Sequence, residues 1–306
     1  MPTLNTHQQQ LSKIEDLGIV PYGSHLQAYL KPSAVQRVRL FSMFGFRSII
    51  TPQHFKQGSN NRATALTLAL LGYAIDNGAF ICWKKQTQFD QNAFTNLVKR
   101  IGAGADWVAV PDVVMDAQAT LKQAHKWIST LRGINKDLNL LFVYQDNMTE
   151  RDLIPILKDG VGVFIGGSDQ GKLEALKWVP DLCSEFGQYC HVGRVNTQNR
   201  IIKCLRAGVD SFDGSGFSLF PTQFRLVQNI IRQNKQVALF DSPTKPNLGR
   251  LIKNRQSALN CLNVSESDLV EYCAAAQNVC VDGVGLRKEA ASLQGYQFLA
   301  RQAVLA

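Results

Sequence analysis

Three aspartates stand where short apolar runs end, which is the placement that catalytic carboxylates need. Asp76 follows YAI, Asp112 follows VAVP and Asp213 follows VDSF. A helix cap or a turn would explain any one of them. Three further runs end in the same way, on Gln145-Asp146-Asn147, Gly166-Gly167-Ser168-Asp169 and Gly193-Arg194. Polar ends on successive runs indicate a shared site, because the C-terminal ends of parallel barrel strands meet at one face.

These residue types suit the recognition and exchange of a purine base. A carboxylate accepts two parallel hydrogen bonds, and the Watson–Crick edge of guanine offers two parallel donors. A glutamine amide or a glycine N–H can donate to the carbonyl oxygen beside them. Two more carboxylates could exchange a glycosidic bond, one attacking the anomeric carbon while the other moves a proton. Glycines would let the flat ring approach the backbone.

The rest of the chain supplies the elements that must hold these residues. Apolar β-rich runs alternate with amphipathic stretches, and two of the expected helices open on the caps Asp90 and Asp116. The candidate strands are 19–25, 47–52, 72–80, 106–114, 139–147, 160–169, 190–196, 209–216 and 237–241. This pattern predicts an α/β fold, a (β/α)8 TIM-like barrel. An open doubly wound sheet is the alternative, although no GxGxxG motif follows a first strand.

The 306 residues are expected to form the barrel and one smaller extension. We place the barrel at 1–241, including a basic N-terminal segment at 17–75. The proline-rich sequence SPTKPNLG then opens a helical C-terminal extension, 242–306, which we expect to pack on the barrel. Within the extension, Ser265 or Ser267 would cap a helix.

The formal net charge of +9 is unevenly distributed. No Asp or Glu occurs at 17–75, and 232–255 carries six basic residues against the single acid Asp241. Two separate basic surfaces favour a polyanionic partner such as nucleic acid. An ordinary solvated surface is the alternative explanation.

Composition disfavours several other classes of protein. The seven cysteines are scattered without a CxxC pair, and no histidine follows His191, so we expect no zinc cluster and no metal. The sequence has neither a long apolar stretch that could span a membrane nor a signal-peptide pattern at its N-terminus. We expect a cytoplasmic protein, in the host cytoplasm if it is phage-encoded, with no membrane contact and no cofactor.

The motifs at about 70–225 resemble, in order, those of the tRNA-guanine transglycosylase superfamily. Its members are (β/α)8 barrels that exchange guanine for a 7-deazaguanine through a covalent glycosyl-enzyme intermediate. VPDVVMD and FVYQDN resemble the segments that bind the purine, which implies that Asp112 and Gln145 contact the base. FIGGSDQGK resembles the segment whose backbone meets the base carbonyl, which implies the same for Gly166 and Gly167.

The resemblance also implies the catalytic roles. IDNGAF is similar to the family's Asp-Ser-Gly-Gly-Phe-Gln motif, so Asp76 would be the general acid/base. As an aromatic residue of this segment, Phe80 is a candidate to stack on the base, with a place in the core as the alternative. GVDSFDG is similar to the family's Gly-Val-Asp-Met-Phe-Asp-Cys, so Asp213 would be the nucleophile. Asp213 would attack C1′ while the purine leaves with a proton from Asp76.

The sequence departs from the family at its zinc site. The Cys-x-Cys-x-x-Cys cluster that supports tRNA binding is absent, and Gly214 replaces the Cys after the nucleophile. These departures favour the DpdA-type branch, found in phages and bacterial modification clusters, which inserts 7-deazaguanines into DNA. The implied partners are DNA, a free 7-deazaguanine base such as preQ0, and accessory modification proteins. The residues expected to hold the nucleic-acid backbone are Arg37, Arg39, Arg47 and Arg194.

Three other functions stay open at this point. A zinc-free enzyme acting on tRNA would use the same motifs. A non-catalytic nucleic-acid-binding barrel would bind in a salt-sensitive way but tolerate loss of Asp76 or Asp213. A phosphate-binding lyase or aldolase would usually need a lysine at a strand end, and the sequence places none there.

Overall fold

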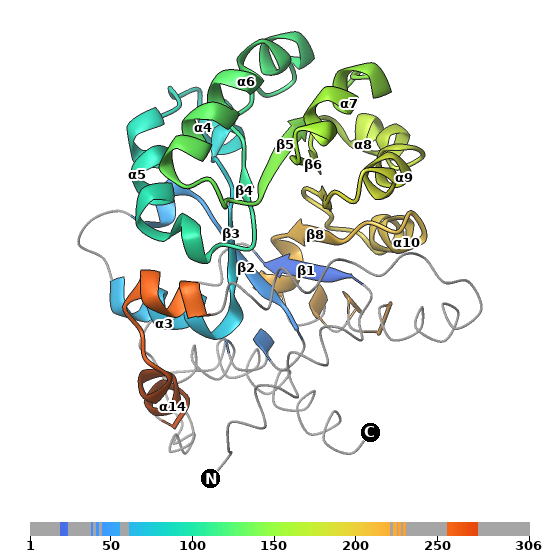
Figure 1. Cartoon of the computed structure of the whole chain (residues 1–306). Helices are drawn as coiled ribbons and strands as arrows, with labels where there is room; N and C mark the ends of the chain where they lie inside the picture. Colours follow the sequence, from blue (N-terminus) through green and yellow to red (C-terminus); the bar gives the residue numbers. More distant parts are fainter. Residues whose placement is uncertain are drawn as a thin grey trace.

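The chain folds into a closed eight-stranded barrel, seen in a computed structural model (Figure 1). The structure describes residues 19–23, 38, 41–42, 45–55, 61–220, 223–224, 226–227, 229–230 and 256–274. All neighbouring strands are parallel, and the barrel closes where the last strand pairs with the first, Val20 opposite Ser211 and Gly23 opposite Gly214. The predicted (β/α)8 barrel is therefore confirmed.

The strands are short and follow the predicted runs. They are β1 (Val20–Gly23), β2 (Arg47–Ile50), β3 (Tyr73–Ile75), β4 (Val108–Ala109), β5 (Leu140–Tyr144), β6 (Gly162–Ile165), β7 (Cys190–Val192) and β8 (Ser211–Gly214). The ninth candidate, 237–241, lies outside the described residues, and the barrel closes without it.

Helices connect successive strands and cover the outside of the barrel (Figure 1). Asp90 and Asp116 begin two of them as predicted, each accepting a hydrogen bond from the backbone N–H three residues on. The helices are α3 (Asn61–Leu71), α4 (Ala79–Lys85), α5 (Gln91–Ile101), α6 (Ala117–Ile134), α7 (Glu150–Lys158), α8 (Asp169–Ala175), α9 (Val179–Glu185), α10 (Gln198–Arg206), α11 (Gly216–Leu219) and α14 (Glu266–Ala274), with short 3-10 turns at Pro52–Phe55 and Gly102–Gly104. The helices between β2 and β8 bring the chain back to the start of the next parallel strand, whereas α11 and α14 follow β8.

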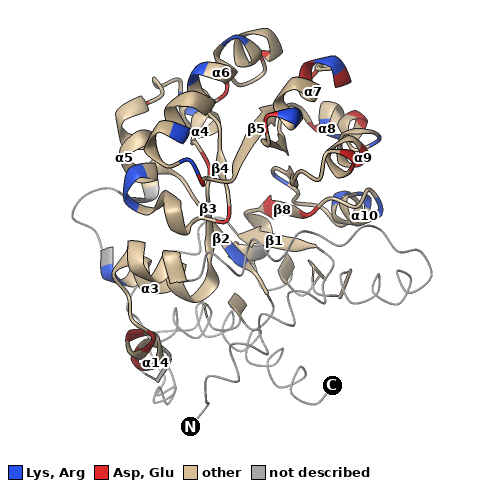
Figure 2. Cartoon of the chain, viewed as in Figure 1, with Lys and Arg blue, Asp and Glu red and all other residues tan. Residues whose placement is uncertain are grey.

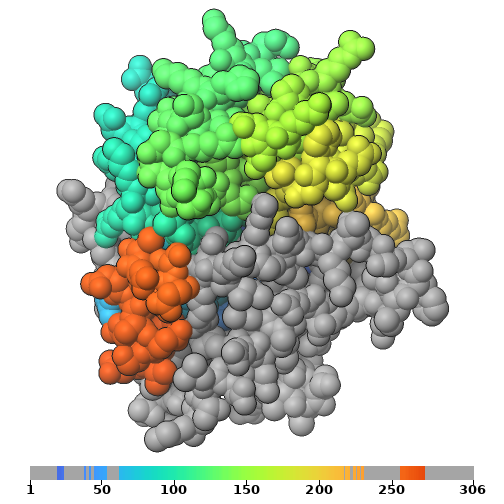
Figure 3. Space-filling model, viewed as in Figure 1, coloured from blue at the N-terminus to red at the C-terminus, as the bar shows by residue number. Residues whose placement is uncertain are grey.

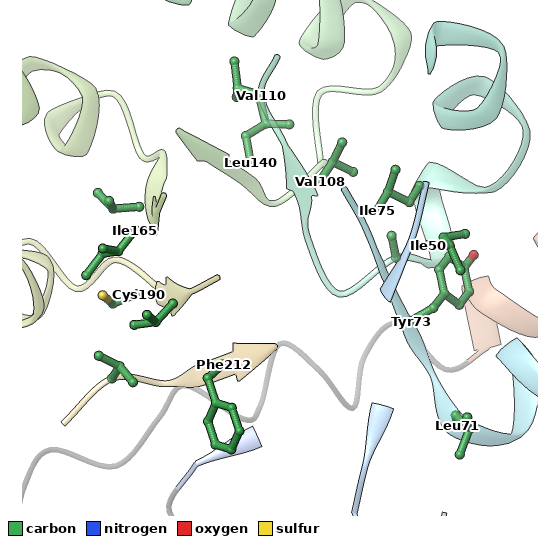
Figure 4. Packing of buried hydrophobic residues seen from close by; sticks show 14 of the residues in the cluster. Ile50, Leu71, Tyr73, Ile75, Val108, Val110, Leu140, Ile165, Cys190 and Phe212 are labelled. Atoms are coloured by element: carbon green, nitrogen blue, oxygen red, sulfur yellow. The ribbon is translucent and has the colours of Figure 1, made fainter. Parts of the chain in front are cut away.

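Alternation along the strands separates two apolar cores. One lies between the strands and the helices, and Figure 4 shows Ile75, Val108, Ile165 and Phe212 from different strands turned toward this layer. The other fills the inside of the barrel, where Tyr22, Trp107 and Leu141 are fully buried. The barrel is therefore packed through its centre, and its open face is at the strand ends.

The described part of the predicted C-terminal extension packs against α3. Residues 256–262 are helical and precede α14. The Tyr272 hydroxyl lies 3.2 Å from Oγ1 of Thr67, and Arg62 forms an ion pair with Asp268. The orange segment accordingly lies beside α3 in Figure 1 and against the edge of the barrel body in Figure 3. The predicted boundary at 241–242 lies outside the described residues.

Among the outer helices, α7 carries charges of both signs, whereas the charged residues of α6 and α10 are all basic (Figure 2). The predicted basic stretch 232–255 lies outside the described residues. Of the basic residues in the stretch 17–75, the structure describes Arg47 and Arg62. No helix in the described ranges is both long enough and apolar enough to cross a membrane.

Candidate active site

One pocket collects the residues that follow six successive strands. Its lining includes every residue predicted to act in catalysis or base binding, together with Arg194. These residues are Asp76 after β3, Asp112 after β4, Gln145 after β5, Gly166 and Gly167 after β6, Arg194 after β7, Asp213 in β8, and Phe80 in α4. The strand ends thus place three carboxylates from separate strands around one cavity, as a parallel barrel does at its C-terminal face.

Asp76 holds the most perturbed carboxyl of the pocket. Its Oδ1 accepts the N–H of Gly78 at 3.0 Å, and Gly78 turns the chain away with a left-handed φ of 81°. Burial raises the pKa of Asp76 to about 7, and the nearby Asp213 and Asp112 add to the rise. The carboxyl is consequently close to half-protonated at neutral pH, which suits a group that gives and takes a proton.

Asp112 is held by two side-chain amides. Nδ2 of Asn77 donates to Oδ1 at 2.9 Å, and Nε2 of Gln145 donates to Oδ2 at 2.7 Å. Gln145 is itself fixed, because its Oε1 accepts the N–H of Met115. Burial raises the pKa of Asp112 to about 6, and the Asn77 hydrogen bond opposes the rise. Each oxygen keeps a second lone pair, so the carboxylate can still accept from a ligand.

Asp213 has different surroundings. Its side chain is 12% exposed and lies at the open end of β8. Oδ1 accepts a hydrogen bond from the backbone N–H of Arg194 at 3.2 Å and lies 3.1 Å from Nε2 of His191. The backbone beside it is tightly packed, because an added Cβ on Gly193 would come within 2.5 Å of the Phe164 ring. Both contacts fall on the same oxygen, so the protein fixes Oδ1 of Asp213.

The glycine pair after β6, Gly166 and Gly167, forms another part of the pocket wall. A Cβ on Gly166 would lie 2.9 Å from the Tyr144 carbonyl oxygen, and Gly167 has a φ of 76° with Oδ1 of Asp146 only 2.1 Å from the Cβ position. The Gly166 N–H is already bonded to Tyr144. The Gly167 N–H donates to no described residue, so of the two it is the amide that a ligand can use.

Arg194 and two aromatic side chains form the rim. The Arg194 guanidinium lies 4.0 Å from the centre of the Phe80 ring and donates to the Gly167 carbonyl. Phe80 stacks in turn on Trp83, with ring centres 5.7 Å apart, and Trp83 is 53% exposed. Lys84 and Lys85 follow on the exposed side of α4. The rim therefore offers flat apolar surfaces beside positive charge.

Arg47 corrects one prediction. It is the first residue of β2, at the end of the barrel away from the pocket, and it is only 7% exposed. Its guanidinium makes two hydrogen bonds of 2.5 Å to the buried Asp106, which also accepts the Tyr22 hydroxyl. Arg47 therefore neutralises an internal carboxylate and is not available to a nucleic-acid backbone. Arg37 and Arg39 lie outside the described residues.

Three residues important to the pocket were missed in the sequence. Asn77 orients Asp112, and His191 lies under Asp213. Lys172 of α8 is buried, and its Nζ donates to the Gly193 carbonyl at 2.9 Å. Burial lowers the pKa of Lys172 to about 8. The lysine fixes the turn that carries Arg194, and it is not among the described residues that line the pocket. Lys172 lies in a helix, so its position carries no strand-end signal in the sequence.

Comparison with protein-family models and with curated proteins gives no match for this chain. The resemblance to the transglycosylase superfamily therefore rests on the sequence motifs alone.

Proposed function

We propose that this protein is a base-exchange transglycosylase that replaces guanine in DNA with a 7-deazaguanine such as preQ0. The observation that carries the proposal is the meeting of Asp76 and Asp213 in one pocket with opposite environments. Burial raises the pKa of Asp76 to about 7, whereas Oδ1 of Asp213 accepts the Arg194 N–H and lies 3.1 Å from Nε2 of His191. Two carboxyl groups made unlike in this way can divide the roles of acid and nucleophile.

Base recognition follows from the fixed polar groups. Asp112 would accept the ring N–H and the exocyclic amine of guanine with the lone pairs left over from Asn77 and Gln145. The Gly167 N–H would donate to the base carbonyl. A ring stacked on the Arg194 side of Phe80 would displace the guanidinium, which would then be free to meet the phosphate of the target nucleotide.

The chemistry needs two carboxyl groups and a leaving base. Asp213 attacks C1′ as the bond from C1′ to the purine nitrogen breaks, and Asp76 gives its proton to the departing guanine. The incoming 7-deazaguanine loses its ring proton to Asp76, and its nitrogen then displaces Asp213 from C1′. Asp76 regains the proton that it gave to guanine, and the bond between Asp213 and C1′ is broken, so both carboxyl groups return to their starting states.

The choice of DNA rests on the sequence. The cysteine cluster that accompanies tRNA binding in the superfamily has no counterpart in this chain. The positive charge of Arg194, Lys84 and Lys85 near the pocket would suit the phosphates of either polymer.

The experiment supplies duplex DNA, single-stranded DNA and unmodified tRNA with preQ0, and measures modified nucleosides by mass spectrometry. We expect preQ0 in DNA and a covalent protein–DNA adduct that is lost in Asp213→Ala. Asp76→Asn should slow adduct formation by about 10²- to 10⁴-fold.

Asp210→Ala is the matched control. Asp210 is a second aspartate of the same segment, but its Oδ2 accepts the Cys190 N–H at the start of β7, away from the pocket. The adduct should persist in this variant. An undiminished adduct in Asp213→Ala would refute the assignment of the nucleophile. Incorporation into tRNA alone would favour the tRNA enzyme, and salt-sensitive binding without incorporation would favour a non-catalytic barrel.

A further inference from the structure

His191 lies inside the barrel, directly beneath the candidate nucleophile. It is fully buried in β7. Trp107 and Phe164 pack against its ring with centres 4.6 Å away, and Tyr22 meets it edge-on at 5.8 Å. The imidazole therefore sits in an aromatic enclosure that fixes its orientation.

Both ring nitrogens of His191 have a partner on the neighbouring strand β8. Nδ1 lies 2.7 Å from Oγ of Ser211, and Nε2 lies 3.1 Å from Oδ1 of Asp213. Ser211 is fully buried, so it cannot meet a substrate. Only the Asp213 end of this series reaches the pocket.

The surroundings of the ring determine which nitrogen carries its proton. Burial lowers the pKa of His191, and the hydrogen bond with Asp213 opposes this less strongly. The side chains that face the ring are those of Tyr22, Trp107, Phe164, Ser211 and Asp213. The Tyr22 hydroxyl is already engaged, because it donates to Asp106. The proposed function requires Asp213 to attack as a carboxylate, whose oxygens can only accept. In that state the neutral imidazole carries its proton on Nε2 and accepts the Ser211 hydroxyl on Nδ1.

The hydrogen bonds to Asp213 distinguish its two oxygens. Oδ1 is held by the His191 imidazole and by the Arg194 N–H. No described residue donates to Oδ2. One oxygen is thus fixed by the protein, and the other is left with its lone pairs available.

We propose that His191 is a positioning residue that holds Oδ1 of Asp213 so that Oδ2 attacks the anomeric carbon. The inference rests on the proposed transglycosylase function. In the attack, the Oδ2–C1′ bond forms while the electron pair of the C1′–nitrogen bond leaves with the base, which takes the Asp76 proton. Oδ1 then becomes the carbonyl oxygen of the ester, and the same two donors remain on it.

The first test requires no activity. In protein labelled with ¹⁵N-histidine, His191 should give the neutral Nε2–H tautomer, with a slowly exchanging N–H proton. That signal should shift in Asp213→Ala. A charged imidazolium, or a proton on Nδ1, would overturn the inference even if the enzyme exchanges bases.

The second test measures single-turnover adduct formation in His191→Leu and His191→Gln. Leucine removes the donor, so the maximal rate should fall by about 10- to 100-fold at unchanged apparent affinity for DNA. Glutamine can again present an N–H toward Asp213 and should recover most of that loss. Equal losses in the two variants, or a wild-type rate in His191→Leu, would overturn the role of His191. A wild-type protein that forms no adduct on any polymer would instead overturn the proposed function, while the tautomer experiment would still report the contact.

Discussion

Replacing Asp76 with asparagine should stabilise the fold while removing base exchange. Burial raises the pKa of this carboxyl from 3.8 to about 7. A shift of this size corresponds to about 4 kcal/mol in favour of the protonated form in the folded chain. Asp76 keeps partial contact with solvent, which screens the effect, so we expect a gain of roughly 1 to 3 kcal/mol.

The gain should depend on pH in a defined direction. Between about pH 4 and pH 7 the folded chain keeps a proton that the unfolded chain has released, so wild-type stability falls as the pH rises through this window. Asparagine does not titrate, and its Oδ1 can still accept the Gly78 N–H. The advantage of Asp76→Asn should therefore be absent below about pH 4 and complete above about pH 7.

Urea unfolding, followed by tryptophan fluorescence at the two ends of this window, measures the effect. Asp112→Asn is the matched control, because both oxygens of Asp112 accept amide N–H groups from Asn77 and Gln145. An amide there would oppose one N–H with another, at a cost of about 1 to 3 kcal/mol. Burial raises the pKa of Asp112 to about 6, which offsets part of this cost at high pH, so we expect Asp112→Asn to be less stable than Asp76→Asn at both pH values. The reasoning is refuted if Asp76→Asn gains nothing at high pH, or if its gain is equal at both.

Three further substitutions test other parts of the structure. Arg47→Met should cost about 3 to 5 kcal/mol in urea unfolding, because Asp106 would stay buried without its guanidinium partner; a loss below about 1 kcal/mol would contradict the buried pair. Gly167→Ala should cost about 1 to 3 kcal/mol and weaken preQ0 binding in calorimetry, because φ is 76° and the new Cβ would lie 2.1 Å from Oδ1 of Asp146; wild-type affinity would argue against the glycine wall. Trp83→Ala should change stability by less than about 0.5 kcal/mol but reduce DNA binding in an anisotropy titration, since the ring is 53% exposed; unchanged binding would remove Trp83 from the interface.

The barrel and most of the pocket could be predicted because their signals are local. A strand that ends on a polar residue is visible in a few letters, and parallel topology then brings all such ends together. The odd spacing of Asp210 and Asp213 in an extended segment likewise predicts opposite faces: Asp213 of β8 lines the pocket, and Asp210, just before β8, accepts the Cys190 N–H. Neither inference requires knowledge of a distant contact.

The errors and omissions concern partners that are distant in the sequence. Arg47 seemed available to phosphate because its neighbourhood contains no acid, yet its partner Asp106 is 59 residues away. His191 served in the sequence only to argue against zinc, because its enclosure is built from β1, β6, β8 and Trp107. Asn77 appeared in the sequence only as the residue after Asp76 in IDNGAF, although its amide, after β3, orients Asp112, after β4. Contacts between residues that are distant in the sequence cannot be predicted from local charge or composition.

The hydrogen bond between Gln145 and Asp112 joins the two halves of the barrel. Strands β1 to β4 supply Asp76 and Asp112, and strands β5 to β8 supply Gln145 and Asp213. Each half-barrel therefore holds one of the two base-binding side chains, Asp112 or Gln145, and one of the two candidate catalytic carboxyl groups, Asp76 or Asp213. A chain split between β4 and β5 would regain the pocket only if its two fragments reassembled. Recovery of the site in a mixture of the fragments would then show that β4 and β5 had paired again as in the intact barrel.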